Sequence, residues 1–118
     1  MKIYHCEGCD KILVNLGEQN GTLGKDELVP GSVDAALEKH VPVVEVKDNT
    51  VTVKVGEVTH PALPEHHIAW ILLETKKGFQ IKYLVPGEAP EATFTLSDDE
   101  PVAAYEYCNL HGLWKKEI

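Results

Sequence analysis

The sequence predicts an all-β protein, an antiparallel sandwich or barrel that follows a small N-terminal segment. Beyond residue 40, short runs rich in β-branched and aromatic residues alternate with turn signals at close spacing, as they do in sandwiches and barrels. Several runs also alternate apolar with polar side chains, the pattern of a strand with one buried face. We therefore expect six or seven strands.

The strands are expected at regular intervals along the β-domain. The first two runs are separated by the turn signal Asp48-Asn49-Thr50. The run 67–75 is apolar enough for a fully buried strand, whereas 92–96 alternates as a half-buried strand does. The predicted strands are 41–46, 51–55, 67–75, 79–84, 92–96 and 102–108.

The first forty residues have a different character. Residues 2–16 predict a hairpin around a Cys-x-x-Cys motif, and residues 17–32 are rich in glycine and polar side chains, which is typical of a loop. We place a domain boundary here, with an N-terminal segment at 1–34 and the β-domain at 35–118.

A short helix is predicted over residues 33–40. The Ser32 hydroxyl can cap it by accepting a hydrogen bond from a free N–H of the first turn. Such a helix carries three chemically active side chains to the edge of the β-domain: Glu38, Lys39 and His40.

Charge and composition restrict the function classes. The chain has 118 residues and a net charge of -8, so it lacks the basic stripe that a nucleic-acid-binding protein uses to neutralise phosphates. No apolar run approaches the length of a membrane span, and no secretory signal is visible. We expect a cytoplasmic protein of one compact domain that binds neither nucleic acid nor membrane.

The three cysteines suit a reducing compartment. Cys6 and Cys9 form the Cys-x-x-Cys motif, and Cys108 stands alone. An odd number fits poorly with an oxidised disulfide framework. The thiols are better read as ligands, reactive groups or buried fillers.

Histidines gather in the connection before residue 67. His60 precedes a proline, which favours an extended backbone, and His66 follows six residues later, beyond a second proline. This spacing suits one loop that folds back and points both rings at a common centre. His67 is the next residue, and neighbours in an extended chain point to opposite faces. One of these two adjacent histidines is therefore expected to be structural.

A second group lies near the C-terminus, where Cys108 and His111 form a Cys-x-x-His step followed by Gly112. Such a step brings sulfur and nitrogen to one ion across a tight turn. A lone histidine is more often a core or surface residue, and a lone cysteine a small buried hydrophobe. Together with His40, however, the two groups predict a metal site with four histidines and one cysteine.

The donor set narrows the choice of metal. One thiolate with several imidazoles suits iron, copper or zinc. Structural zinc sites close at four ligands and usually contain more sulfur. A blue-copper site normally has an axial thioether, and the only methionine is Met1, although a carbonyl or a glutamine can take that place. Four nitrogens and one sulfur leave one octahedral position open, which suits a redox iron that binds a small molecule.

Three stretches carry a family resemblance. The segments LEKHVPVVEV (37–46), KVGEVTHPALPEHHIAW (54–70) and AYEYCNLHGLW (104–114) resemble superoxide reductases of the desulfoferrodoxin and neelaredoxin group, and the resemblance extends from about Ser32 to Lys115. It implies an immunoglobulin-like seven-stranded antiparallel β-sandwich with a small N-terminal extension. It also implies one mononuclear non-haem iron (Fe2+/Fe3+) per chain, with four equatorial histidines and an axial cysteine. The implied ligands are His40, His60, His66, His111 and Cys108.

The resemblance also implies an activity. The family reduces superoxide to hydrogen peroxide by one electron, without releasing dioxygen, and usually takes the electron from rubredoxin. By this resemblance Lys39 attracts superoxide and Glu38 can occupy the sixth position of the oxidised iron. A homodimer is expected, as is common in the family.

The N-terminal segment departs from the family pattern. Desulfoferrodoxins hold a second iron there with four cysteines, a Cys-x-x-Cys and a later adjacent pair. Here Cys6 and Cys9 are present, but residues 26–32 read DELVPGS, and two thiolates do not complete a four-cysteine site. We interpret the segment as a degenerate desulforedoxin-like hairpin kept for packing. A metal shared across a dimer, a third ligand from His5 and a disulfide are the alternatives.

Two other functions compete with a superoxide reductase. One is a copper electron carrier of cupredoxin type that uses His60, Cys108 and His111. The other is a β-sandwich interaction domain with structural zinc.

Overall fold

The computed structural model describes residues 1–6, 11–16 and 27–118. Strands dominate these ranges, and they hold no helix long and apolar enough to cross a membrane. In chain order the elements are β1 (Ile3–His5), β2 (Ile12–Val14), α1 (Leu37–His40), β3 (Pro42–Lys47), β4 (Thr50–Val55), β5 (Ile68–Thr75), β6 (Gly78–Tyr83), β7 (Glu91–Thr95), β8 (Pro101–Cys108) and β9 (Gly112–Glu117).

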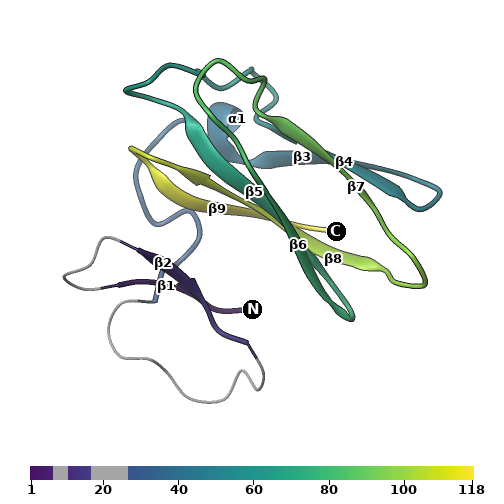
Figure 1. The fold of residues 1–118 in the computed structure, drawn as a ribbon. Helices are drawn as coiled ribbons and strands as arrows, with labels where there is room; N and C mark the ends of the chain where they lie inside the picture. The colour runs from purple at the N-terminus through teal and green to yellow at the C-terminus, as the bar shows by residue number, and fades with distance from the viewer. Residues whose placement is uncertain (7–10, 17–26) are drawn as a thin grey trace.

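Two antiparallel sheets form the sandwich (Figure 1). One sheet has the order β3-β4-β7, and the other has the order β6-β5-β8-β9. The predicted all-β class and the seven strands are therefore confirmed, and each of the six strand positions was found. The seventh strand, β9, lies beyond the last segment that the sequence pattern located.

The core between the sheets comes from the alternation that predicted the strands. In β4 and β7 every second residue is buried, and Val53 and Phe94 are examples. They pack against Ile71, Leu73 and Ala104 of the facing sheet. Burying one such large apolar side chain contributes about 1.5–3 kcal/mol.

The run 67–75 is continuously apolar because strand β5 is covered on both faces. Ile71 and Leu73 point into the core between the sheets, whereas Trp70 and Leu72 belong to a second apolar cluster on the opposite face. That cluster includes Ile3 of β1, with partly buried side chains from β2 packed against it. The N-terminal hairpin is thus a third layer over the four-stranded sheet (Figure 1).

The hairpin itself was predicted, and its strands pair in antiparallel register from Ile3 with Val14 to His5 with Ile12. Cys6 is disulfide-bonded, and Cys9 lies outside the described residues. The domain boundary after residue 34 stays a prediction.

The predicted helix was wrong in length and in its cap. α1 covers only Leu37–His40, its N-cap is Ala36, and no side chain caps it. Ser32 instead donates its backbone N–H to Val29, and the neighbouring Gly31 N–H donates to the Leu113 carbonyl of β9. Hydrogen bonds to the sandwich therefore hold this segment in a turn, and local helix propensity does not prevail.

A buried carboxyl group lies inside the sandwich. Glu106 occupies β8 between Ala104 and Cys108, is 0% exposed, and neither of its carboxyl oxygens has a hydrogen-bond partner within the described residues. Burial raises the pKa of Glu106 to about 9, because a charge is unfavourable in an apolar interior. Glu106 is therefore a neutral acid near pH 7.

Glu106 should make the folded state less stable as pH rises. Between the ordinary pKa of 4.5 and the folded value of about 9, the folded chain keeps a proton that the unfolded chain releases. The free energy of unfolding should therefore fall between pH 6 and 9, by at most about 1.4 kcal/mol per pH unit. Glu106→Gln should remove this slope in denaturant titrations. The exposed Glu91→Gln should keep it, and parallel curves for parent and Glu106→Gln would contradict the assignment.

Candidate metal centre

Three chain segments meet at one end of the sandwich. α1 ends at His40, directly before β3, while His60 and His66 lie in the connection between β4 and β5. Cys108 is the last residue of β8, and His111 lies in the tight turn before β9. The sheet topology thus brings together five side chains that the sequence spreads over 72 positions, counted from 40 to 111.

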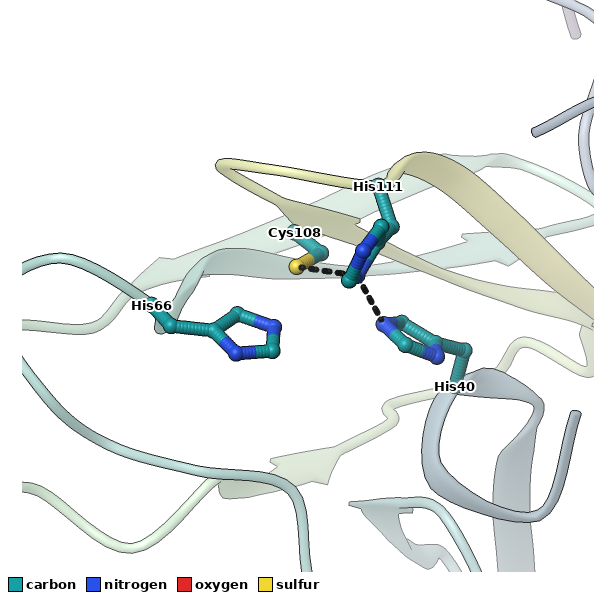
Figure 2. A group of neighbouring side chains, drawn as sticks. All are labelled: His40, His66, Cys108 and His111. Atoms are coloured by element: carbon teal, nitrogen blue, oxygen red, sulfur yellow. Dashed lines mark hydrogen bonds between the residues drawn. The ribbon is translucent and has the colours of Figure 1, made fainter. Parts of the chain in front are cut away.

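The four imidazoles form a ring. Going round from His40 to His60, His66 and His111, neighbouring ring centroids are 4.8, 4.6 and 5.1 Å apart, and the step back to His40 is 4.9 Å. Neighbouring rings are nearly perpendicular, at 76–88°, whereas His40 and His66 face each other across the ring at 6.4 Å and 27°. Figure 2 shows these two opposed rings pointing toward each other. The arrangement resembles four equatorial positions round one centre.

The cysteine sulfur joins the same cluster. Cys108 Sγ lies 3.4 Å from His60 Nε2 and 3.8 Å from His111 Nδ1. The ligand atoms of His40, His66, Cys108 and His111 all lie within 4.8 Å of one another (Figure 2). His60 Nε2 is also 3.2 Å from His40 Nε2. Four nitrogens and one sulfur therefore converge.

Hydrogen bonds on the far side of two rings fix their tautomers. His40 Nδ1 lies 2.8 Å from the Ala36 carbonyl, and His60 Nδ1 lies 2.8 Å from the Pro61 carbonyl. Because a carbonyl only accepts, each Nδ1 carries the hydrogen, and each neutral ring turns an Nε2 lone pair toward the centre.

The donor atoms fit a bound cation. The Nε2 lone pairs of His40 and His60 face each other at 3.2 Å, with His111 Nδ1 3.1 Å from His40 Nε2 and Cys108 Sγ 3.4 Å from His60 Nε2. His66 Nε2 is buried and has no hydrogen-bond partner within the described ranges. The Nε2 atoms of His40, His60 and His66 could therefore bind a metal ion, since neutral imidazole is the ligand form of histidine.

The electrostatics of the site point the same way. Burial lowers the pKa of His40 and His66, and lowers the pKa of His60 to about 4, so these rings are neutral near pH 7. Burial also raises the pKa of the Cys108 thiol, against the smaller effect of the Leu110 and His111 backbone N–H groups. A cation reverses this balance, because a coordinated thiol is deprotonated.

Two further predicted residues lie beside the cluster. Glu38 and Lys39 are exposed on α1, and the Glu38 carbonyl accepts a hydrogen bond from Val58 N–H. Lys39 directly precedes His40, and its positive charge is a minor cause of the lowered pKa of His40 and His66, after burial.

His67 has a different role from His66. Its Nδ1 lies 3.1 Å from the Leu63 carbonyl, so its ring closes the surface turn that carries His66. This contact agrees with the expectation that one of the two adjacent histidines is structural.

Trp114 is a contact of the site that the sequence analysis missed. Its buried indole stacks on His40, with centroids 5.0 Å apart at 27°. Its Nε1–H donates to the His111 carbonyl at 3.1 Å. In the sequence, the available signal was a large aromatic residue three positions after His111. The stacking on His40 could not be predicted from it, because His40 lies far away in the chain.

Gly56 was missed as well. It has φ +82°, and a Cβ there would lie 2.6 Å from the Val58 carbonyl oxygen and 2.7 Å from the Lys39 carbonyl group. Its own N–H donates to the Val41 carbonyl at 3.3 Å. Only glycine allows the connection after β4 to approach the backbone of α1 this closely.

Comparison with known proteins identifies the family. The profile described as Desulfoferrodoxin matches residues 32–117. The chain belongs to the desulfoferrodoxin family. The desulfoferrodoxin of Desulfarculus baarsii is 44% identical over 127 residues, covering 99% of this chain and 96% of that protein. The superoxide reductase of Pyrococcus horikoshii is 40% identical over 99 residues, covering 69% of this chain and 86% of that protein.

Comparison with solved structures also finds superoxide reductases. The crystal structure of the superoxide reductase from Treponema pallidum matches with a TM-score of 0.81 and 43% identity, over 99% of this chain and 100% of that chain. Family membership and a ring of four imidazoles leave the cupredoxin alternative unsupported, because its site uses only two of these histidines.

Gly56→Ala should disturb both the fold and the site. A left-handed backbone costs a non-glycine residue about 1–2 kcal/mol, and the added methyl also overlaps the backbone of Lys39. We expect the free energy of unfolding to fall by at least about 2 kcal/mol. Because α1 carries His40, affinity for Zn2+ should fall as well, measured by competition with a chelating dye.

Gly87→Ala is the matched control. Gly87 has φ +96°, but no atom lies within 4 Å of an added Cβ. In this variant the free energy of unfolding should fall only by the cost of the left-handed backbone, about 1–2 kcal/mol. Its affinity for Zn2+ should equal that of the parent. Equal Zn2+ affinity in both variants would show that Gly56 does not support the site.

Proposed function

We propose that this protein is a superoxide reductase, which reduces superoxide to hydrogen peroxide at a mononuclear non-haem iron. The observation that carries the proposal is the ring of four imidazoles with one cysteine sulfur beside it. Relatives over most of the chain are named superoxide reductase. The proposed iron ligands are His40, His60, His66, His111 and Cys108.

The donor set supports iron in preference to zinc or copper. Four nitrogens and one sulfur exceed the four ligands of a structural zinc site and the His2Cys set of blue copper. These residues would supply five donor atoms to bound iron, and a small anion could bind beside them. Bound iron would supply the single electron by changing between its ferrous and ferric states.

A residue of the chain has to attract superoxide to the site. The reaction takes up one electron and two protons for each superoxide. The net charge of -8 repels this anion at long range, so a local positive charge has to attract it at the site. We assign that role to Lys39, which is exposed on α1 and directly precedes the proposed ligand His40.

Two other side chains complete the proposal. The Cys108 thiolate would donate electron density to bound iron; its side chain is 0% exposed and belongs to the apolar cluster between the sheets. Glu38, exposed on the same short helix as Lys39, is proposed to occupy the sixth position once the iron is oxidised. It would then exclude water from the resting site.

Electron supply and assembly follow from the family resemblance. We propose a rubredoxin-like electron donor, a homodimer and a cytoplasmic location. We also propose one iron per chain, because the segment 26–32 has no cysteine that could complete a four-cysteine site with Cys6 and Cys9.

Cys108→Ser tests the proposed function directly. The iron-loaded parent should contain one iron per chain, show a thiolate-to-iron absorption band, and consume superoxide without releasing dioxygen. The variant should lose the band and reduce superoxide at least about 100-fold more slowly, since loss of even an outer partner of a metal ligand costs 10–100-fold. Metal analysis, absorption spectra and pulse radiolysis provide the three measurements.

A double Cys6→Ser, Cys9→Ser variant is the control. It should keep its iron, its absorption band and its rate. Dioxygen release by the parent, or an unchanged band and rate in Cys108→Ser, would refute the proposal.

Lys39→Ala should slow the encounter with superoxide about tenfold at low ionic strength, because the local attraction is lost. Its rate should also depend less on salt than the parent rate does. Lys47→Ala removes the same charge at the far end of β3 and should behave as the parent does. Equal second-order rates for parent and Lys39→Ala at low salt would exclude this role for Lys39.

A further inference from the structure

His66 lies on a short surface turn, unlike the two most deeply buried rings of the site. Two backbone hydrogen bonds close the turn, from Leu63 N–H to the His66 carbonyl at 2.9 Å and from His66 N–H to the Leu63 carbonyl at 3.1 Å. The His40 and His60 side chains are almost completely buried, at 2% and 1% exposure, whereas His66 is only partly buried. Packing therefore restrains His66 less.

The His66 ring also lacks a restraint that its neighbours have. His40 and His60 are each oriented by an Nδ1–H bond to a backbone carbonyl. Within the described part of the chain the His66 ring makes no hydrogen bond, and its Nε2 is buried without a partner. The direction of this ring thus depends on where the main chain on either side is held.

One side chain holds both flanks of His66. Asn109 Oδ1 accepts a hydrogen bond from His67 N–H at 2.9 Å, and Asn109 Nδ2 donates to the Glu65 carbonyl at 3.1 Å. Asn109 N–H also donates to the His67 carbonyl at 3.1 Å. Since one partner only donates and the other only accepts, the orientation of the amide is fixed.

Asn109 connects the turn that carries His66 to the turn that carries Cys108 and His111. Asn109 directly follows Cys108 and lies two positions before His111. Its three hydrogen bonds therefore connect the segment that supplies sulfur and one nitrogen to the segment that supplies His66. Asn109 is itself exposed, so it contributes little to the core, and its hydrogen bonds are its main structural effect.

We propose that Asn109 is a positioning residue that sets the His66 ring against the other donor atoms and so controls how firmly the metal is held. The inference rests on the proposed function only in taking His66 as a metal ligand. Without the Asn109 amide, the turn at 63–66 keeps its own two bonds but loses its attachment to the Cys108 segment. The His66 donor then moves relative to the others.

A double-mutant cycle on the Co2+-loaded protein tests the proposal. The four proteins are the parent, Asn109→Ala, His66→Ala and the double variant. The readouts are the rate of Co2+ release into excess chelator and the Co2+ d–d absorption, which is stronger at lower coordination number. Asn109→Ala should release Co2+ about 10–100-fold faster than the parent and absorb more strongly. If Asn109 acts through His66, the double variant should match His66→Ala.

Two further variants separate positioning from a general effect on stability. Asn49→Ala removes another exposed turn asparagine, in the link between β3 and β4, and should leave both readouts within about twofold of the parent. Asn109→Asp keeps the acceptor for His67 N–H but loses the donor to Glu65, so its release rate should lie between those of the parent and Asn109→Ala. Should Asn109→Ala fail to fold, as circular dichroism would reveal, Asn109→Asp replaces it in the cycle with the same expected coupling.

Three results would overturn the proposal. The first is a parent-like rate of Co2+ release from Asn109→Ala. The second is a double variant whose release rate is increased by the product of the two single-variant factors. The third is a parent-like release rate from His66→Ala. None of these measurements involves superoxide. Failure of the iron-loaded parent to reduce superoxide would therefore refute the proposed function and leave the Co2+ cycle to decide the role of Asn109.

Discussion

The site depends on buried nitrogen and sulfur atoms that the fold holds close together at one end of the sandwich. Nε2 of His40 and Nε2 of His60 face each other at 3.2 Å, and the Nδ1 hydrogen of each ring is already used by a backbone carbonyl. Both rings are neutral near pH 7, because burial lowers their pKa, so their Nε2 lone pairs are available to a metal. A metal that binds these atoms only in the folded chain would therefore also stabilise this end of the fold.

The sandwich makes this arrangement possible by fixing where each segment ends. Cys108 pairs with Ile68 of β5 on one side and with Gly112 of β9 on the other. The register of β8 with these two strands therefore determines where the Cys108 sulfur lies at the end of the sheet. The core residues of β5 and β8 hold that register, since a slip of one position would turn every apolar side chain to the wrong face. The precision of the site thus derives from ordinary packing several residues away.

Local patterns allowed much of the fold and the candidate ligands to be predicted from the sequence. Strands β3 to β8 were found because their alternation is contained in the strand itself, and the Cys108–His111 step because its spacing is local. α1 was mispredicted because Gly31 is bound to Leu113, a contact between distant segments. Trp114, Asn109 and Gly56 escaped for the same reason: each acts on a residue that the sequence does not place beside it. The copper alternative survived until the structure placed four rings round one point.

The third layer of the molecule limits how the chain can be divided. The hairpin β1–β2 covers Trp70 and Leu72 on the outer face of β5, and a β-domain cut free at residue 35 would expose these two side chains to water. A truncated form would need polar substitutions on β5 or another surface to cover it, or it would associate with itself. The N-terminal segment lacks the second cysteine pair of a metal module. Its structural role is to cover the outer face of β5, the strand that also packs into the core between the two sheets.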